Sequence, residues 1–343
     1  MGYYTPARTV LLTGAGFTQS FGGLLGKEMW EAIFNQRNIQ ARPKLRKRIL
    51  EQMNYEDFYS EVMTGLNYDA EEKDAVAAAV KEAYIQMHRH LCRQGEPRHS
   101  ASAAGVCARV IARFEGWDRE RGFLFTLNQD LFIERHFLSR SRLLKIPGMH
   151  HHQWFNGGLP GDLDASHLVR LPDAATVANL RIQFEEKGSP SFVYIKLHGS
   201  LAWTGTDGSD AMVIGDTKTE MIKREPLLQW FLELFEKTVL EPERQLVIIG
   251  YGFGDQHINE IIAKAISDSR LKLIIVAPAY ALDFRHRLSP LGGFIDFEPA
   301  HKGGRIWSGV THYLRGTVED LYHPARVDLP EKGRAFFENL GLN

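Results

Sequence analysis

Four short apolar segments, none of which alternates polar and apolar residues, constrain the fold more than any other feature. They lie at Thr9–Thr13, Phe123–Thr126, Leu246–Gly250 and Leu271–Ala277. Strands with this pattern are covered by helices on both faces. After the third segment, apolar residues recur at helical spacing from Ile258 to Ile266, which makes a strand–helix–strand unit. The sequence therefore predicts a doubly wound, Rossmann-like α/β fold with a parallel sheet.

The length of the chain leaves room for an insertion in that fold. The 343 residues correspond to about two ordinary units, or to one large unit with an insertion. We interpret residues 1–343 as one α/β domain. Residues 27–118 have mostly helical patterns and are too many for one crossover, so they predict an inserted helical subdomain over the ligand-binding end of the sheet. Residues 145–191, rich in Gly, Pro, Asp and His, predict a long irregular loop.

Composition narrows the class of protein. With 41 basic and 42 acidic residues, no overall field attracts nucleic acid or a membrane. The basic stretch Arg42–Arg48 lacks interleaved aromatic residues, and Pro43 fits the first turn of a helix, so we interpret it as a solvated helix face. Cys92 and Cys107 match no metal spacing. No apolar run approaches the roughly 20 residues of a membrane helix, so we expect a soluble cytoplasmic protein.

A glycine-rich turn at Thr13–Thr18, the first glycine turn, follows the first predicted strand. Gly14 and Gly16 let the backbone approach a phosphate, and amides ahead of a helix offer donors for it. Gln19 stands where the dinucleotide fingerprint has glycine, and no acidic residue ends a second strand about 20 residues later. An ordinary hydride-transfer enzyme is therefore disfavoured, and the turn by itself fits either nucleotide binding or a purely structural role.

Polar residues end other predicted strands, where ligands of doubly wound sheets bind. Asn128 and Asp130 either face that crevice or cap the helix that begins near Leu131. His198 is either a titrating group at a strand end or, as lone histidines more often are, structural. Residues 250–255, the second glycine turn, join a strand to a helix. Two such turns favour an extended ligand that contacts both halves of the sheet.

The run His150–His152 invites comparison with a metal site. Adjacent residues do not easily turn three rings toward one ion, and no carboxylate or cysteine lies at ligand spacing. We therefore expect no metal there.

In their order along the chain, these motifs resemble the sirtuin family. The matching segments are Gly-Ala-Gly-x-Thr at 14–18, Thr-x-Asn-x-Asp at 126–130 and His-Gly at 198–199. The second glycine turn and Gly316–Asp320 look like that family's ribose- and adenine-side segments. The resemblance covers most of the predicted sheet but not the helical insertion.

The resemblance implies that NAD is a substrate, bound between sheet and insertion and cleaved at its nicotinamide–ribose bond. Asn128 would contact the nicotinamide ribose and position water, and Asp130 would bond the carboxamide. His198 would act as a general base on a ribose hydroxyl or on that water. The residues implied to hold NAD, the first four at its diphosphate, are Gly14, Ala15, Gly16, Thr18, Gly250, Gly252, Gly254, Asp255, Thr317 and Val318.

Departures from the family pattern refine the expected activity. Sirtuin deacylases carry a four-cysteine zinc ribbon, which Cys92 and Cys107 do not supply, so no zinc is expected. The family's glutamine before the asparagine is Leu127 here, and its serine in the first turn is Thr18. The chain therefore looks like the zinc-free sirtuin-like domains of bacterial antiphage systems, which resemble NAD hydrolases. The stand-alone kind, encoded beside a HerA-type ATPase, fits best.

The sequence thus predicts an NAD glycohydrolase effector that releases nicotinamide and ADP-ribose and depletes NAD in antiphage defence. We expect a low basal rate, with control by homo-oligomer assembly or by a HerA-type ATPase partner. Two alternatives stay open: a nucleotide-binding sensor or scaffold that recruits an ATPase, and an NAD-dependent deacylase with an unusual acceptor site. Neither membrane binding nor direct nucleic-acid binding is indicated, and no carboxylate cluster supports a nuclease.

Overall fold

The protein is built on a parallel sheet flanked by helices, which confirms the predicted doubly wound α/β fold. The structure, a computed structural model, describes residues 5–93, 103–116, 120–138, 144–148, 162–185, 192–288 and 302–321, together with 335, 336, 338 and 340. The strands of the main sheet run in the order β11-β10-β9-β2-β3-β6-β4, with β1 also paired to β3, and each pairing described is parallel. Their bounds are β1 Thr5–Pro6, β2 Thr9–Thr13, β3 Glu120–Thr126, β4 Leu144–Lys145, β6 Phe192–Lys196, β9 Gln245–Ile249, β10 Lys272–Ala277 and β11 Val310–Arg315.

The apolar composition of the strands follows from their central position. Strand β2 lies between β9 and β3 and is buried along its whole length. Its Leu11 pairs with Val247 of β9 and Leu124 of β3, and all three side chains are inaccessible to solvent. Because both faces of such a strand are covered, no polar residue alternates along it.

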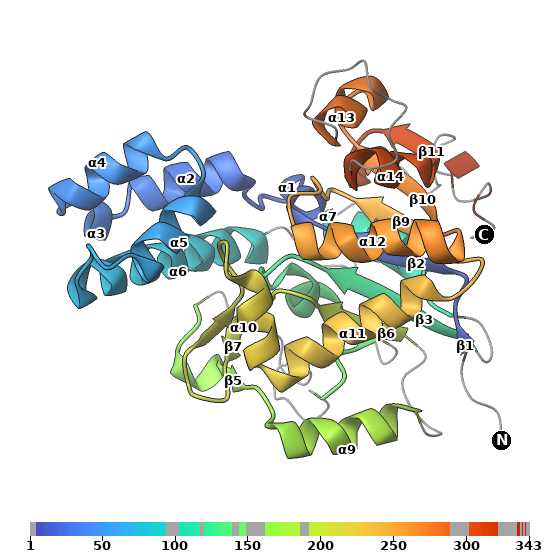
Figure 1. Cartoon of the computed structure of the whole chain (residues 1–343), viewed down its shortest axis with the longest axis horizontal. Helices are drawn as coiled ribbons and strands as arrows, with labels where there is room; N and C mark the ends of the chain where they lie inside the picture. The colour runs from blue at the N-terminus through green and yellow to red at the C-terminus, as the bar shows by residue number, and fades with distance from the viewer. Residues whose placement is uncertain are drawn as a thin grey trace.

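Helices close the sheet on its faces. In Figure 1, α11 (Pro226–Leu240) and α12 (Gln256–Ser269) cross side by side over the strands, and these two helices pack on each other. The apolar stripe of α12 is buried through Ile258 and Ile262, as its spacing predicts. The other helices of this part are α1 Ala15–Gln19, α7 Ala103–Ala112, α10 Lys218–Arg224, α13 Ala281–Leu288, α14 Lys302–Ser308 and α15 Val318–Leu321.

Between β2 and β3 the chain forms the helical insertion, defined here as helices α2 to α6. They are α2 Gly26–Phe34, α3 Arg37–Gln40, α4 Pro43–Glu51, α5 Tyr55–Thr64 and α6 Ala70–Cys92. Figure 1 shows them grouped at one side of the sheet. Pro43 opens α4, as predicted, and α6 starts at a capping box between Asp69 and Glu72. Helix α7, at the end of the expected insertion, instead contacts α15 beside the sheet.

The expectation of one irregular loop over residues 145–191 is wrong for part of that range. Helix α9 spans Ala174–Glu185. The Asp173 carboxylate accepts a hydrogen bond from the Thr176 amide at the start of the helix, and the helix buries its own side chains Val177 and Phe184. A small second sheet also forms from β5 Val169–Arg170, β7 Gly199–Thr204 and β8 Asp210–Met212. The histidine run at 150–152 lies outside the described residues.

Two negative findings apply to the described part of the chain. None of its helices combines the length and the apolar character that crossing a bilayer requires. Cys92, which is half-buried, and Cys107, which is buried, form no disulfide bond within that part.

Candidate functional site

A cavity of about 430 Å³ lies at the carboxyl ends of the sheet strands. With about 4.8 Å between neighbouring strands, the span from the end of β3 to the end of β11 is roughly 19 Å. Helices α2, α5 and α6 of the insertion supply the facing wall. The cavity is lined by these predicted residues: Gly14, Ala15, Gly16, Thr18, Asn128, Asp130, His198, Gly250, Gly252, Gly254, Asp255 and Thr317.

Val318 is the predicted residue that lies elsewhere. Its side chain is inaccessible to solvent and is not part of the cavity lining. As the first residue of α15 it packs into the core, so we assign it no contact with a ligand.

The two glycine turns are pressed against each other. The Gly14 amide donates to Ile249 O at 3.1 Å and the Gly16 amide to Gly250 O at 2.9 Å. A Cβ atom on Gly14 would lie 2.7 Å from the Cα of Tyr251. The glycines are therefore required structurally, and two of the amides expected to bind a phosphate are occupied by the neighbouring strand. The Ala15 amide has no hydrogen-bond partner among the described residues.

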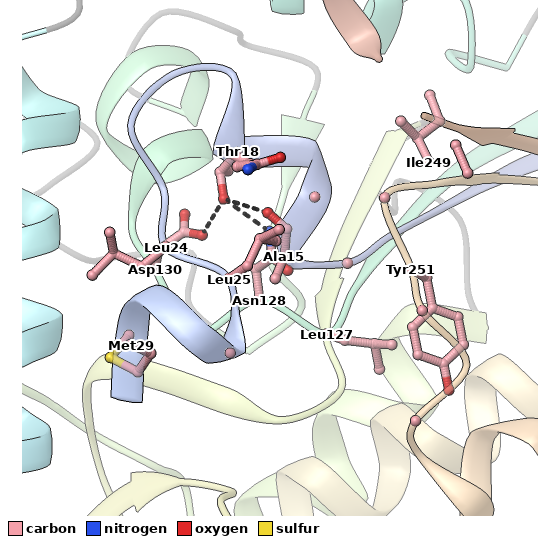
Figure 2. A pocket seen from close by; sticks show the side chains of 18 of the residues that line it. Ala15, Thr18, Leu24, Leu25, Met29, Leu127, Asn128, Asp130, Ile249 and Tyr251 are labelled. Carbon is pink, nitrogen blue, oxygen red and sulfur yellow. Dashed lines mark hydrogen bonds between the residues drawn. The ribbon is translucent and has the colours of Figure 1, made fainter. Parts of the chain in front are cut away.

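Thr18 ties the first glycine turn to the polar residues after β3. Its hydroxyl donates to Asp130 Oδ2 at 3.0 Å and accepts from Asn128 Nδ2 at 3.4 Å, as Figure 2 shows. The other carboxylate oxygen of Asp130 accepts the Phe132 amide at 3.0 Å, so the helix-capping role left open by the sequence is real. Asn128 Oδ1 has no partner within the described part of the chain and is free to accept from a ligand or water.

His198 lies at the end of a chain of charged and polar contacts. Its Nε2 is 3.0 Å from Nε2 of His257 and 3.9 Å from the Asp255 carboxylate. The Lys218 ammonium bonds both Asp255 and Glu56, each at 2.6 Å. The ligand atoms of His198, Asp255 and His257 all lie within 4.8 Å of one another, as in metal sites. Here, however, the two imidazoles bond each other and Lys218 neutralises the carboxylate.

Part of this site lies in a segment that matches a known family. Residues 122–289 match the SIR2-like domain. The matched part, just under half of the 343 residues, contains Asn128, Asp130, His198 and the second glycine turn, but not the first. A search of the curated proteins found no match. The match supports a sirtuin-like family, whose SIR2-like domains are generally NAD-dependent enzymes.

The Asp255 side chain lies near His198. The resemblance assigns it to the ribose and adenine side, together with the rest of the second glycine turn. The structure places its carboxylate at the His198 end of the cavity, paired with Lys218. The reason is that Asp255 directly precedes α12, and the start of this helix, which carries His257, lies beside His198.

Burial controls the protonation of this site. Burial lowers the pKa of His198 to about 3, although the Asp255 carboxylate opposes this shift. Burial also lowers the pKa of His257. Burial raises the pKa of Asp255, but His198 and Lys218 more than offset it, and the pKa lies below its ordinary value. At neutral pH the two imidazoles are therefore uncharged and Asp255 is ionised.

Several residues at this site were missed by sequence analysis. His257 follows Asp255 by two positions in an ordinary amphipathic helix, and Lys218 and Glu56 lie on helices with no motif. Nothing local marks them, because their relevance comes from contacts across 37 to 162 residues of chain. The further unpredicted residues on the insertion's wall are Met29, Tyr55, Tyr84 and Met87.

Proposed function

We propose that this protein hydrolyses NAD⁺ at the nicotinamide–ribose bond and releases nicotinamide and ADP-ribose. The observation that carries the proposal is the presence of Asn128 and Asp130 from one motif and His198 from another in one cavity with the first glycine turn. The match to the SIR2-like domain supports an NAD-related ligand.

The shape of the cavity supports a dinucleotide rather than a single small molecule. It follows the strand ends from His198 after β6, past Gly14 and Gly250, to Thr317 after β11. Its volume is within the range of small-molecule sites. With the nicotinamide end at Asn128 and His198, the adenosine end lies at the ends of β10 and β11, and the diphosphate lies between them at the two glycine turns.

The polar groups suit cleavage of an N-glycosidic bond. Nicotinamide leaves as a neutral molecule, so the enzyme needs no acid at the leaving group. It must hold the carboxamide, stabilise an oxocarbenium-like ribose and present one water molecule. The partner-free Asn128 Oδ1 is suited to that water or to the ribose. Asp130, fixed by Thr18 and Phe132, retains acceptor capacity for the carboxamide.

The test is mass-spectrometric product analysis of NAD⁺ incubated with wild type and with Asn128→Ala. We expect wild type to form nicotinamide and ADP-ribose in equal amounts, and the variant to be at least about 100-fold slower. Asn38→Ala, an exposed asparagine on α3 outside the cavity, is the matched control and keeps the wild-type rate. An Asn128→Ala enzyme with wild-type turnover would remove the mechanism. Tight NAD⁺ binding without products would favour the sensor or scaffold function instead.

The biological setting of this activity is also a proposal. From the resemblance to zinc-free antiphage domains, we infer NAD depletion in defence, with a low basal rate and control by homo-oligomer assembly or by a HerA-type ATPase partner. Because free turnover would be toxic, the NAD⁺ assay includes the chain alone and together with any ATPase encoded beside it. An increase in rate with the ATPase supports the proposal, and equal full activity in its absence contradicts it.

A further inference from the structure

The contact between His198 and His257, the histidine pair, has no role in the hydrolysis mechanism above. Their rings are tilted by 39° with centroids 5.1 Å apart, and the two Nε2 atoms face each other at 3.0 Å. His198 comes from the end of β6 and His257 from the first turn of α12, so the contact bridges two separate motifs. A separation of 3.0 Å between nitrogens is a hydrogen bond, so one hydrogen lies between them when both rings are neutral.

The direction of that hydrogen bond decides what His198 can do. If His257 donates, His198 carries its hydrogen on Nδ1 and offers no lone pair to a ligand. If His198 donates, its Nδ1 is a free acceptor. The side chain lines the cavity, and Nδ1 has no partner among the described residues. A general base needs such an exposed lone pair.

We propose that His198 donates its Nε2 hydrogen to His257, and that His257 is the positioning residue that receives the proton His198 passes on during NAD⁺ hydrolysis. This inference rests on the proposed function. The O–H bond of the ribose hydroxyl or water breaks as Nδ1–H of His198 forms. Nε2–H of His198 breaks as Nε2–H of His257 forms, and His257 then returns its Nδ1 hydrogen to solvent.

Burial explains why a second imidazole is needed. His198 is 3% exposed, and burial lowers its pKa to about 3, so it is a weak base if it has to keep the proton. With the transfer to His257, no net charge stays in the buried ring. Burial lowers the pKa of His257 as well, but its side chain is only partly buried, and the carboxylates of Asp255 and Glu260 favour its charged form. The Lys218 ammonium opposes that charge and is itself held by Asp255 and Glu56.

A kinetic experiment tests the transfer with His257→Gln, which keeps a hydrogen-bonding side chain but cannot carry the proton. We expect kcat to fall about 100-fold, the lower end of a general-base contribution, with KM within about twofold of wild type. The acid limb of the kcat profile moves to lower pH, because only His198 then titrates. Added imidazole restores part of the rate of His257→Ala. His286→Gln, the same change at an exposed position of α13, behaves as wild type.

Wild-type kcat and an unshifted acid limb in His257→Gln would overturn the transfer while leaving NAD⁺ hydrolysis in place. A loss of rate that imidazole does not restore and that leaves the pH profile unmoved would mean a structural role only. If wild type itself releases no nicotinamide, the proposed function fails.

A second measurement decides the hydrogen bond without any turnover. Nitrogen NMR of [¹⁵N]histidine-labelled protein, assigned with His198→Gln and His257→Gln, reports which ring nitrogen is protonated. The expected result at pH 7.5 is an Nε2–H tautomer for His198. An Nδ1–H tautomer, or a stoichiometric metal ion that wild type holds and His257→Gln loses, would overturn the inference.

Discussion

The main-chain amide of Gly16 donates a 2.9 Å hydrogen bond to the carbonyl oxygen of Gly250, so the two glycine turns are held directly against each other. Gly250 adopts a φ of 71°, in the left-handed region that favours glycine. The shape of the first turn therefore depends on a residue more than 230 positions away.

Gly250→Ala is expected to destabilise the protein strongly. Its Cβ would lie 2.2 Å from the Phe17 nitrogen and 2.3 Å from the Gly16 carbonyl carbon, and the backbone strain alone costs about 1–3 kcal/mol. Urea unfolding measures the loss. Gly254→Ala is the control, because a Cβ there meets nothing within 4 Å, and its free energy of unfolding should stay within about 1 kcal/mol of wild type. Equal stability of the two variants would contradict the packing described.

Thr18→Val is expected to lower kcat for NAD⁺ hydrolysis about tenfold or more. Valine has the shape of threonine but lacks the hydroxyl that joins Asn128 to Asp130, so both polar groups lose their fixed orientation. Thr18→Ser keeps the hydroxyl and should retain most of the activity. Steady-state assays of nicotinamide release compare the two, and similar rates would show that the hydroxyl is dispensable.

Lys196→Met is expected to cost about 3–5 kcal/mol of stability, because it leaves a buried carboxylate without its partner. The Lys196 ammonium is completely buried, 2.8 Å from Glu134 Oε1, and it also donates to the carbonyl oxygen of Asp130 at 2.6 Å. Thermal or urea unfolding gives the value. Adding Glu134→Leu removes the buried charge and should recover part of the loss; a double variant no more stable than Lys196→Met would argue against this explanation.

Stability is expected to fall as the pH drops below about 6.5, partly because of His198. The unfolded state binds a proton near pH 6.5, whereas burial keeps the folded imidazole neutral to about pH 3. The contribution of the neutral, buried His198 imidazole to the free energy of unfolding is therefore fully present above pH 6.5 and is lost progressively toward pH 3. Between pH 7 and 5.5 this one group removes about 1 kcal/mol. Urea unfolding is measured for wild type and for His198→Gln at both pH values. Between them, wild type should lose more free energy of unfolding than the variant by that amount, and identical pH slopes would contradict the explanation.

Local sequence was sufficient wherever the relevant interaction is local or repeats along one element. The unbroken apolar character of Thr9–Thr13 reflects burial on both faces, and Pro43 and Asp69 act on the helices that they begin. Helix α9 shows the limit of such reasoning. It has no clear amphipathic repeat, and its stability depends on the burial of its Val177 and Phe184 side chains.

The sequence by itself predicts the α/β sheet and most of the residues at its carboxyl edge, because strand ends and glycine turns are marked by neighbouring residues. Only the tertiary structure reveals that Gly16 packs on Gly250, that His198 bonds His257, and that Lys218 joins Asp255 to Glu56. These contacts join segments that are distant in the chain, and burial then sets their protonation. Neither effect leaves a periodic or short-range signal that a sequence could display.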